Sequence, residues 1–483
     1  MQLALAVLDL HGSCDELPAA ATGHVEIHTV VETHDAHCAH TPRHGVMEEI
    51  TVARKPAKCL AHIPGMGVPP HQATTRHLGA AYPFASESGL GGRGVLIGRD
   101  LLGGAFVYDP FELYRSGLLT NPNMVVIGQI GRGKSAFVKT YLWRLAVFGR
   151  QAWVVDPKGE YGALARAWGV EPVALRPGGP VRLNPLDALP SAGDIGTEDE
   201  DVLRRRCELL ASLAMASLGR QLLPTERSAL DLAVAHASTP ATGPTLPTVV
   251  DALLRPDPRA AHAVGTDAAG LAADGRNVAL ELRRLVAGDL RGMFDGPTSR
   301  GIRLDAPLVV LDLSAVYHSA ALGILMTCAT AWLQAGLGSV GTVTDGVVVV
   351  VDEAWAILAN LGVARWLQSS WKLSRARGVS NVAVLHRLSD LETTGAVGSE
   401  QVGLARGLLA DSETRVVYAQ PPGEVDRAAP LLGLSSTEAE LVPHLGRGVA
   451  LWKVGTRSFL VQHRLSPHEV DIVDTDARMA GQL

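Results

Sequence analysis

The stretch MVVIGQIGRGKSAFVKTYL, residues 124–142, restricts the possible fold of this chain more than any other. It places an apolar run before three glycines, a lysine and a serine, and an amphipathic segment after them. This order fits G-x-x-x-x-G-K-[ST], in which glycines let backbone N–H groups surround phosphate oxygens. The pattern predicts a strand, a phosphate-binding loop and a helix whose positive dipole end faces the anion. A glycine turn before a surface helix is the alternative interpretation.

The loop pattern also indicates which side chain meets which part of a nucleoside triphosphate. Lys134 is expected to reach the β- and γ-phosphates, and Ser135 to ligate Mg²⁺. ATP and Mg²⁺ are therefore the expected ligands. The candidate nucleotide-binding residues of the loop are Gly128, Gln129, Ile130, Gly131, Arg132, Gly133, Lys134, Ser135 and Ala136.

Two acidic residues after five valines form a second pattern, VVVVVDE at 347–353. β-Branched residues favour a buried central strand, and the two acids would stand at its end. Asp352 is expected to hold hydrated Mg²⁺, and Glu353 to orient or polarise the attacking water. A buried strand that ends in an N-cap carboxylate is the alternative. Because the chain also has the phosphate-binding loop, the two patterns together predict nucleotide hydrolysis.

Composition limits the class of protein without identifying it. The chain has 483 residues, 47% of them hydrophobic and 19% charged, which suits two or three packed domains rather than a disordered protein. Its net charge of -6 argues against a nucleic-acid binder that uses the whole surface. The odd number of cysteines, five, favours reduced thiols and a cytoplasmic location. We find no segment apolar enough to span a membrane, so we expect any membrane association to come through partners.

Strand-like and helical patterns divide the chain into four zones. Residues 1–80 predict a small N-terminal region that is β-rich or partly disordered. Residues 81–190 and 301–483 alternate apolar strands with helices, which is typical of a parallel α/β sheet, and residues 191–300 predict an all-helical insertion. The N-terminal region also contains the residue types of a zinc site, although the spacing matches no closed structural site. These residues are His34, His37, Cys38, His40 and His44.

The order of several motifs resembles the large ATPase of conjugative type IV secretion channels, within the FtsK/HerA-like superfamily. These motifs are GQIGRGKS, then DPKGEYG at 156–162, NPL at 184–186, a helical insertion, VDEAW and WKLSRARGVSNVAVLHR. The resemblance runs from about residue 80 to residue 478. It implies a RecA-like P-loop NTPase core with a mostly parallel central sheet, an inserted helical lobe and subunits arranged in rings, commonly hexamers. The channel-docking region of that family is usually longer than the 80 residues here, which is expected of a short variant or a truncated chain.

The resemblance also implies a role for the DPKGEYG motif. Asp156, Lys158 and Glu160 match the family's motif at the end of the strand that follows the phosphate-binding loop. Open α/β sheets place ligands at this edge, so Asp156 and Lys158 are expected to contact the nucleotide. A Pro-Lys-Gly turn without a ligand is the alternative.

Three further residues are assigned only by the resemblance. SRAR at 374–377 corresponds to the region of the family's trans-acting arginine, which implies Arg375 as the arginine finger and Arg377 as its rival. A solvated basic helix end is the alternative. His386 stands where the superfamily usually has a glutamine that senses the γ-phosphate. A neutral imidazole can donate one hydrogen bond as an amide does, but its protonation would then matter near neutral pH.

The leading hypothesis is an ATPase that energises a conjugative or type IV secretion apparatus from the cytoplasmic side of the cell membrane, in assembly or in substrate transfer. Its expected partners are other copies of the chain in a ring, commonly a hexamer in that family, and membrane secretion-channel proteins. A DNA-translocating coupling-type motor is the first alternative, and a nucleotide-gated ring scaffold is the second. Nonspecific DNA contacts are expected at local basic clusters, notably Arg204, Arg205 and Arg206.

Overall fold

A computed structural model describes the chain from residue 89 to residue 473, with gaps. The described ranges are 89–187, 197–238, 243–288, 290–302, 304, 306–336, 346–358, 361–374, 378–387 and 400–473. The predicted N-terminal region and its histidine-rich tract lie outside these residues. So do Arg375 and Arg377. The four domain boundaries, and the roles proposed for these two arginines, therefore stay predictions.

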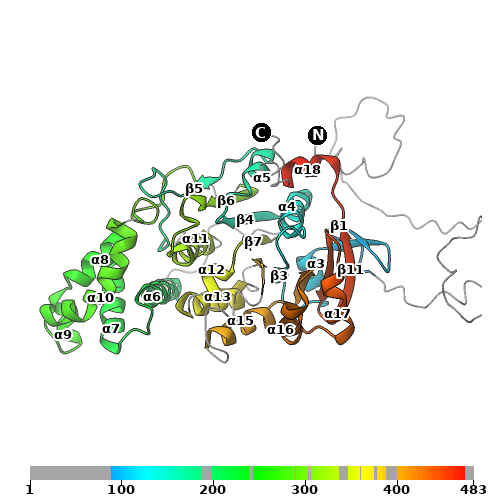
Figure 1. The fold of residues 1–483 in the computed structure, drawn as a ribbon. Coiled ribbons are helices and arrows are strands. Elements are labelled where there is room, and N and C mark those ends of the chain that lie inside the picture. The colour runs from blue at the N-terminus through cyan, green and yellow to red at the C-terminus, as the bar shows by residue number, and fades with distance from the viewer. Residues whose placement is uncertain are drawn as a thin grey trace, which may run out of the picture. The chain divides into compact units, whose positions relative to one another are not determined.

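Within the described residues, a single sheet of eleven strands forms the centre of the molecule (Figure 1). The order across the sheet is β2-β1-β11-β10-β9-β3-β8-β7-β4-β6-β5. The strands are β1 (Val95–Asp100), β2 (Ala105–Tyr108), β3 (Met124–Ile127), β4 (Gln151–Asp156), β5 (Val173–Ala174), β6 (Leu308–Asp312), β7 (Val347–Val351), β8 (Val379–Leu385), β9 (Thr414–Tyr418), β10 (Val449–Val454) and β11 (Arg457–His463).

The sheet is parallel from β9 to β5 and antiparallel at its other edge. β3 pairs in parallel with β8 and β9, and β7 pairs in parallel with β8 and β4. Two parallel strands can be joined only by a long crossover connection, and the helices between these strands supply it. β10 and β11 form an antiparallel hairpin that joins β9 to β1. The predicted strands of the parallel part are confirmed, whereas the sequence patterns gave no indication of the hairpin.

Helices cover both faces of the sheet. Successive valines of β7 point to opposite faces, so they pack in two separate cores. Val348 and Val350 pack in one core, with the buried residues of α4 and α5. Val347, Val349 and Val351 pack in the other, with those of α11, α12 and α13. Figure 1 shows α4, α5 and α18 on one side of the sheet and α11, α12 and α13 on the other. These helices are α4 (Lys134–Leu145), α5 (Gly162–Ala167), α11 (Leu322–Gly336), α12 (Trp355–Leu358), α13 (Leu361–Ser374) and α18 (Pro467–Val473).

A group of helices between β5 and β6 extends from the second face. They are α6 (Thr197–Leu218), α7 (Pro224–Ala237), α8 (Leu246–Leu254), α9 (Pro258–Ala263) and α10 (Ala268–Ala287). α6 packs against α11 and α13, and its apolar side chains belong to the same core as the sheet face above them. α7, α8 and α10 pack on one another farther from the sheet, as Figure 1 shows in green. This lobe contains helices and no strand among its described residues.

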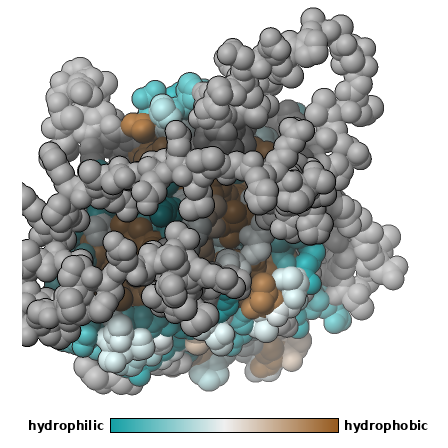
Figure 2. Space-filling view, turned by 90° about the vertical axis from the view of Figure 1, so that its right-hand side faces the viewer, coloured by the Kyte–Doolittle hydropathy of each residue, from teal (hydrophilic) through white to brown (hydrophobic). Residues whose placement is uncertain are grey.

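Shorter helices complete the layers on the two faces of the sheet. They are α3 (Pro110–Arg115), α15 (Glu400–Ala410), α16 (Pro422–Leu432) and α17 (Ser436–Leu441), with 3-10 turns η2 (Ala146–Phe148), η3 (Ser314–Val316) and η5 (Val442–His444). α3 packs in the first core, and α15 and α16 pack in the second. Among the described helices, none is both long and apolar enough to cross a membrane. Figure 2 shows both hydrophilic and hydrophobic residues among the described residues that are visible in that view.

Candidate functional site

The phosphate-binding loop connects β3 to α4 and has the backbone that its glycines permit. Gly131 and Gly133 have positive φ angles of 78° and 109°, a region that side chains with a Cβ rarely adopt. Lys134 follows as the first residue of α4 and is buried. Its Nζ donates hydrogen bonds to the carbonyl oxygen of Gly128 and, at 3.1 Å, to that of Gln129. The ammonium is therefore held inside the loop, and burial lowers the pKa of Lys134 to about 8.

Two segments far along the chain hold this loop in place. The backbone N–H of Gln129 donates to the carbonyl of Ala419, just after β9, at 3.0 Å. The N–H of Gly448, in the turn before β10, donates to the carbonyl of Arg132 at 3.0 Å. Gly128 packs so closely on Tyr418 that a Cβ at position 128 would collide with the Tyr418 Cβ. The end of β9 and the turn before the C-terminal hairpin thus shape the predicted nucleotide site.

Asp352 directly follows β7, at the same edge of the sheet as the phosphate-binding loop, with one strand, β8, between β7 and β3. Its Oδ1 accepts a hydrogen bond from the N–H of Glu353 at 2.9 Å, and its Oδ2 accepts one from the hydroxyl of Tyr161 at 3.3 Å. Burial, aided by the negative charges of Glu353 and Asp156, raises the pKa of Asp352 to about 7. A buried carboxylate with this environment gains from a nearby cation.

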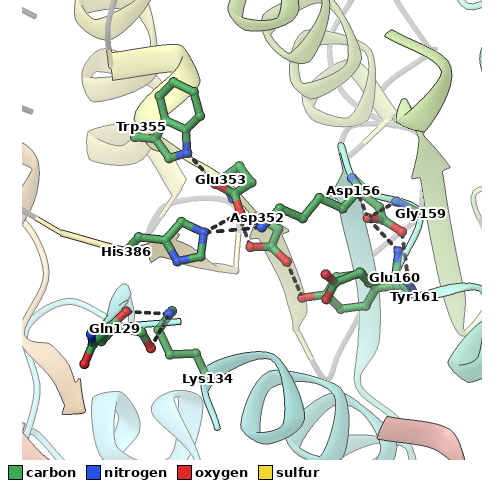
Figure 3. A network of polar contacts seen from close by, with 12 residues as sticks. Gln129, Lys134, Asp156, Gly159, Glu160, Tyr161, Asp352, Glu353, Trp355 and His386 are labelled. Carbon is green, nitrogen blue, oxygen red and sulfur yellow. Dashed lines mark hydrogen bonds and ion pairs between the residues drawn. The ribbon is translucent and has the colours of Figure 1, made fainter. Parts of the chain in front are cut away.

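Glu353 has an unusual backbone and a crowded carboxylate (Figure 3). Among the described residues, it is the one non-glycine residue with a positive φ, at 53°. Such strain is common at functional sites, where the surrounding structure imposes it. Nε2 of His386 lies 2.6 Å from Glu353 Oε1, and Nζ of Lys158 forms an ion pair with the same oxygen. Nε1 of Trp355 donates to the other oxygen, Oε2.

These contacts determine how basic Glu353 is. Burial alone would raise the pKa of Glu353, but the hydrogen bonds and positive charge of His386 and Lys158 outweigh burial and lower this pKa to about 2. The same contact raises the pKa of Lys158 against the opposing effect of its burial. In this arrangement Glu353 is ionised and is a weak base, because its charge is already neutralised by its partners.

Asp156 organises the loop that carries Lys158. Its Oδ1 accepts hydrogen bonds from the N–H groups of Lys158 at 3.2 Å, Gly159 at 2.8 Å and Glu160 at 3.2 Å. Its Oδ2 accepts a fourth, from the N–H of Tyr161 at 2.9 Å. Burial raises the pKa of Asp156 to about 6, although the bonds from Gly159, Glu160 and Tyr161 oppose the shift. The carboxylate therefore shapes the loop that directs Lys158 to Glu353 and Tyr161 to Asp352.

The structure brings most of the candidate residues to one edge of the sheet. They all lie at the carboxyl ends of parallel strands: the phosphate-binding loop, Asp156, Lys158, Asp352, Glu353 and His386. His386 contacts Glu353 directly. The expected role of His386 as a sensor of the γ-phosphate did not include this contact. Tyr161 and Trp355 also join the site and were not identified from the sequence. Tyr161 lies within the DPKGEYG motif and Trp355 within VDEAW, so the motifs contained both without indicating their contacts.

Comparisons with known proteins extend this description. No protein-family model matches the chain, and no curated protein matches it. Among solved structures, VirB4 of Thermoanaerobacter pseudethanolicus shares 22% sequence identity and superimposes with a TM-score of 0.62, covering 80% of this chain and 100% of that chain. The bacterial conjugative coupling protein TrwBdeltaN70 is more distant, with 15% identity and a TM-score of 0.49 over 78% of this chain and 91% of that chain.

The similarity to VirB4 shows a shared fold. It confirms the expected α/β fold with a mostly parallel central sheet, and it agrees with the resemblance drawn from the order of the motifs. The arrangement at the sheet edge combines an anion-binding loop, a buried lysine and two adjacent acids. That combination suits phosphoryl transfer to water, which needs positioning and charge stabilisation rather than covalent catalysis.

Proposed function

We propose that this chain binds and hydrolyses ATP and thereby energises a conjugative or type IV secretion apparatus. The observation that carries the proposal is the meeting of the Lys134 loop with the Asp352–Glu353 pair at one edge of a VirB4-like sheet. The loop's N–H groups and the α4 N-terminus would bind the phosphates. Lys134 would exchange its carbonyl partners for phosphate oxygens, and Glu353 would orient the attacking water.

The residues present fit a magnesium ion. Ser135 and Asp352 offer the hard oxygen ligands that Mg²⁺ prefers, and the environment of Asp352 is one that a cation would stabilise. When bound with ATP, the ion would neutralise charge on the phosphates. Asp156 has a different task in this proposal. Since its four backbone hydrogen bonds already engage both oxygens, it acts on the nucleotide through the loop that it shapes.

The secretion assignment and the cellular setting are part of the same proposal. VirB4 matches this chain along its whole solved length, which supports a related role at the cytoplasmic face of a membrane, reached through secretion-channel proteins. We propose a homo-oligomeric ring, in which a neighbouring copy supplies Arg375 to the site. The VDEAW acids and the intact loop favour hydrolysis over a ring scaffold that only binds nucleotide.

A DNA motor is the second candidate, and the structure changes how it must be tested. Arg205 donates to the carbonyl of Asp187 at 3.0 Å, and Arg206 donates to that of Leu186 at 2.8 Å. These two arginines therefore fasten α6 to the preceding segment, and replacing either would disturb the fold. Arg204 is exposed and pairs with Asp201 on the same helix, so it is the member of the cluster that DNA could reach.

The experiment that tests the assignment compares DNA stimulation with membrane recruitment. We expect ATP turnover to change little when duplex or single-stranded DNA is added at low salt. We also expect membranes that contain the secretion channel to retain the protein, and membranes without the channel to release it. Stimulation by DNA of severalfold, removed by salt and by Arg204→Glu, together with no recruitment, would instead support the DNA motor. Asp201→Lys is the matched variant, since it adds positive charge at the same surface and should raise any DNA response.

A further inference from the structure

The carboxylate of Glu353 is surrounded by three donors, Lys158, His386 and Trp355, which we call the glutamate cage. The Glu353 side chain is 1% exposed, so water does not reach it freely. Oε1 contacts Lys158 and His386, and Oε2 accepts from Trp355. A residue that orients the attacking water needs an oxygen available at hydrogen-bond distance from that water. An ionised carboxylate has about four acceptor positions, and the three donors occupy most of them. Departure of one donor would give Glu353 a further open position and make it a stronger acceptor for the attacking water.

The three donors differ in how firmly the fold holds them. His386 directly follows β8, and its carbonyl accepts a hydrogen bond from Nε2 of Gln420 at 2.8 Å. Trp355 is the first residue of α12, immediately after the strained turn at Glu353. Lys158 lies on the loop between β4 and α5, next to Gly159 with φ 72°, and its long side chain is 25% exposed. Lys158 is therefore the donor that can move with the smallest change elsewhere.

Lys158 also lies close to the place where phosphate would bind. Its positive charge is near enough to Lys134 to lower the pKa of that lysine further, so the two ammonium groups converge from β3 and β4 on one region. Its Nζ lies 5.9 Å from the Tyr317 ring centre and 3.3 Å from His386 Nε2. A terminal phosphate held by Lys134 would carry more negative charge than the single carboxylate that now holds Lys158.

We propose that Lys158 is shared between two anions: the Glu353 carboxylate before ATP binds, and the terminal phosphate of ATP afterwards. The move removes one of the two donors from Glu353 Oε1, so that this oxygen can accept a hydrogen bond from water while His386 stays in contact with it. ATP binding would thus itself activate the site. ADP lacks the terminal phosphate, so Lys158 would stay on Glu353 and the cage would stay closed. This inference rests on the proposed nucleotide function and adds a regulatory step to it.

A double-mutant cycle on nucleotide affinity tests the exchange. Dissociation constants for a non-hydrolysable ATP analogue and for ADP, both with Mg²⁺, are measured by calorimetry for the wild type, Glu353→Gln, Lys158→Met and the double variant. Competition for Lys158 predicts that Glu353→Gln tightens analogue binding about fivefold more when Lys158 is present than in the Lys158→Met background. For ADP the two backgrounds should respond alike.

Simple charge repulsion predicts the opposite sign for the coupling between the two substitutions. If Glu353 only repels the phosphate, Glu353→Gln should help at least as much without Lys158 as with it, because the lysine no longer offsets the repulsion. Equal or reversed coupling would therefore overturn the exchange, and so would the same coupling with ADP. Wild-type protein that binds neither ligand would overturn the nucleotide function itself, which keeps the two failures distinct.

Two controls protect this experiment from trivial explanations. Lys158→Gln replaces Lys158→Met if the methionine variant does not fold, as judged by thermal unfolding. Lys453 and Glu438 form a comparable pair, at 2.8 Å and with each side chain 13% exposed, on β10 and α17. Lys453→Met and Glu438→Gln should leave the affinities for both ligands unchanged. A matching change in this control pair would show that the effect does not come from the glutamate cage.

Discussion

Gly128 has no room for a side chain, since Tyr418 fills the space that a Cβ would occupy. We expect Gly128→Ala to displace the phosphate-binding loop, because overpacking of this kind costs about 1–3 kcal/mol. ATP affinity should fall about 10- to 100-fold, which corresponds to about 1.4–2.8 kcal/mol of binding free energy. Isothermal titration calorimetry measures it. Gly403, exposed on α15 with open space around it, provides the control, and Gly403→Ala should leave affinity unchanged.

The sequence indicated the residue types at the site better than their contacts. The loop pattern and the two acids could be recognised because each is contiguous in sequence. Contacts across strands depend on register instead. Val351 lies opposite Val155 and Ala383, which brings the segments after β4, β7 and β8 together. This register allows Glu353 to meet Lys158 and His386, and no local pattern contains that information.

At the scale of elements, Arg144 fastens the helix of the phosphate-binding loop to two distant segments. It donates to both carboxylate oxygens of Glu469 on α18, at 2.6 and 2.7 Å, and to the carbonyl oxygens of Leu96 and Ile97 on β1. Arg144→Ala would leave the buried Glu469 carboxylate without its cation. We expect a loss of about 3–5 kcal/mol of unfolding free energy, measured by urea denaturation at neutral pH. Arg255→Ala, at an exposed pair with Asp251, should cost less than about 1 kcal/mol.

The same pair gives a pH dependence with a definite sign. Burial opposes the shift, but the hydrogen bonds and charge of Arg144 dominate and lower the pKa of Glu469. A carboxyl whose pKa is lowered on folding contributes stability above its ordinary pKa, about 4.3, and loses it as pH falls through the lowered value. The difference between wild type and Arg144→Ala should therefore shrink in acid. A difference that is constant with pH would contradict the ion-pair explanation.

Most strands of the parallel sheet could be predicted from their continuous apolar runs, as in β7. The C-terminal hairpin could not. β10 is buried along most of its length and β11 contains several polar residues, so neither has the clear alternation that identifies an antiparallel strand. Aromatic packing determines the position of this hairpin. Phe459 and Trp452 contact Phe106 on β2, and Trp452 also contacts Phe137 on α4.

For the whole molecule, ATP turnover is the activity on which every other part of this account depends. The sheet unites the phosphate-binding loop, the acid pair and the lysine loop at a single edge, and the helical lobe packs on the face behind α13. The motif order indicated this plan over about 400 residues. These motifs do not identify a transported substrate, because such a substrate would contact other surfaces of the molecule rather than the nucleotide site.

Steady-state ATP hydrolysis with Mg²⁺ is the measurement that tests the central claim most directly. It compares the wild type with Lys134→Ala and Glu353→Gln, each shown to be folded by thermal unfolding. We predict that the wild type turns over ATP, that Lys134→Ala neither binds nor hydrolyses it, and that Glu353→Gln binds ATP and retains it without turnover. A folded Lys134→Ala protein that hydrolyses ATP at the wild-type rate would contradict the account.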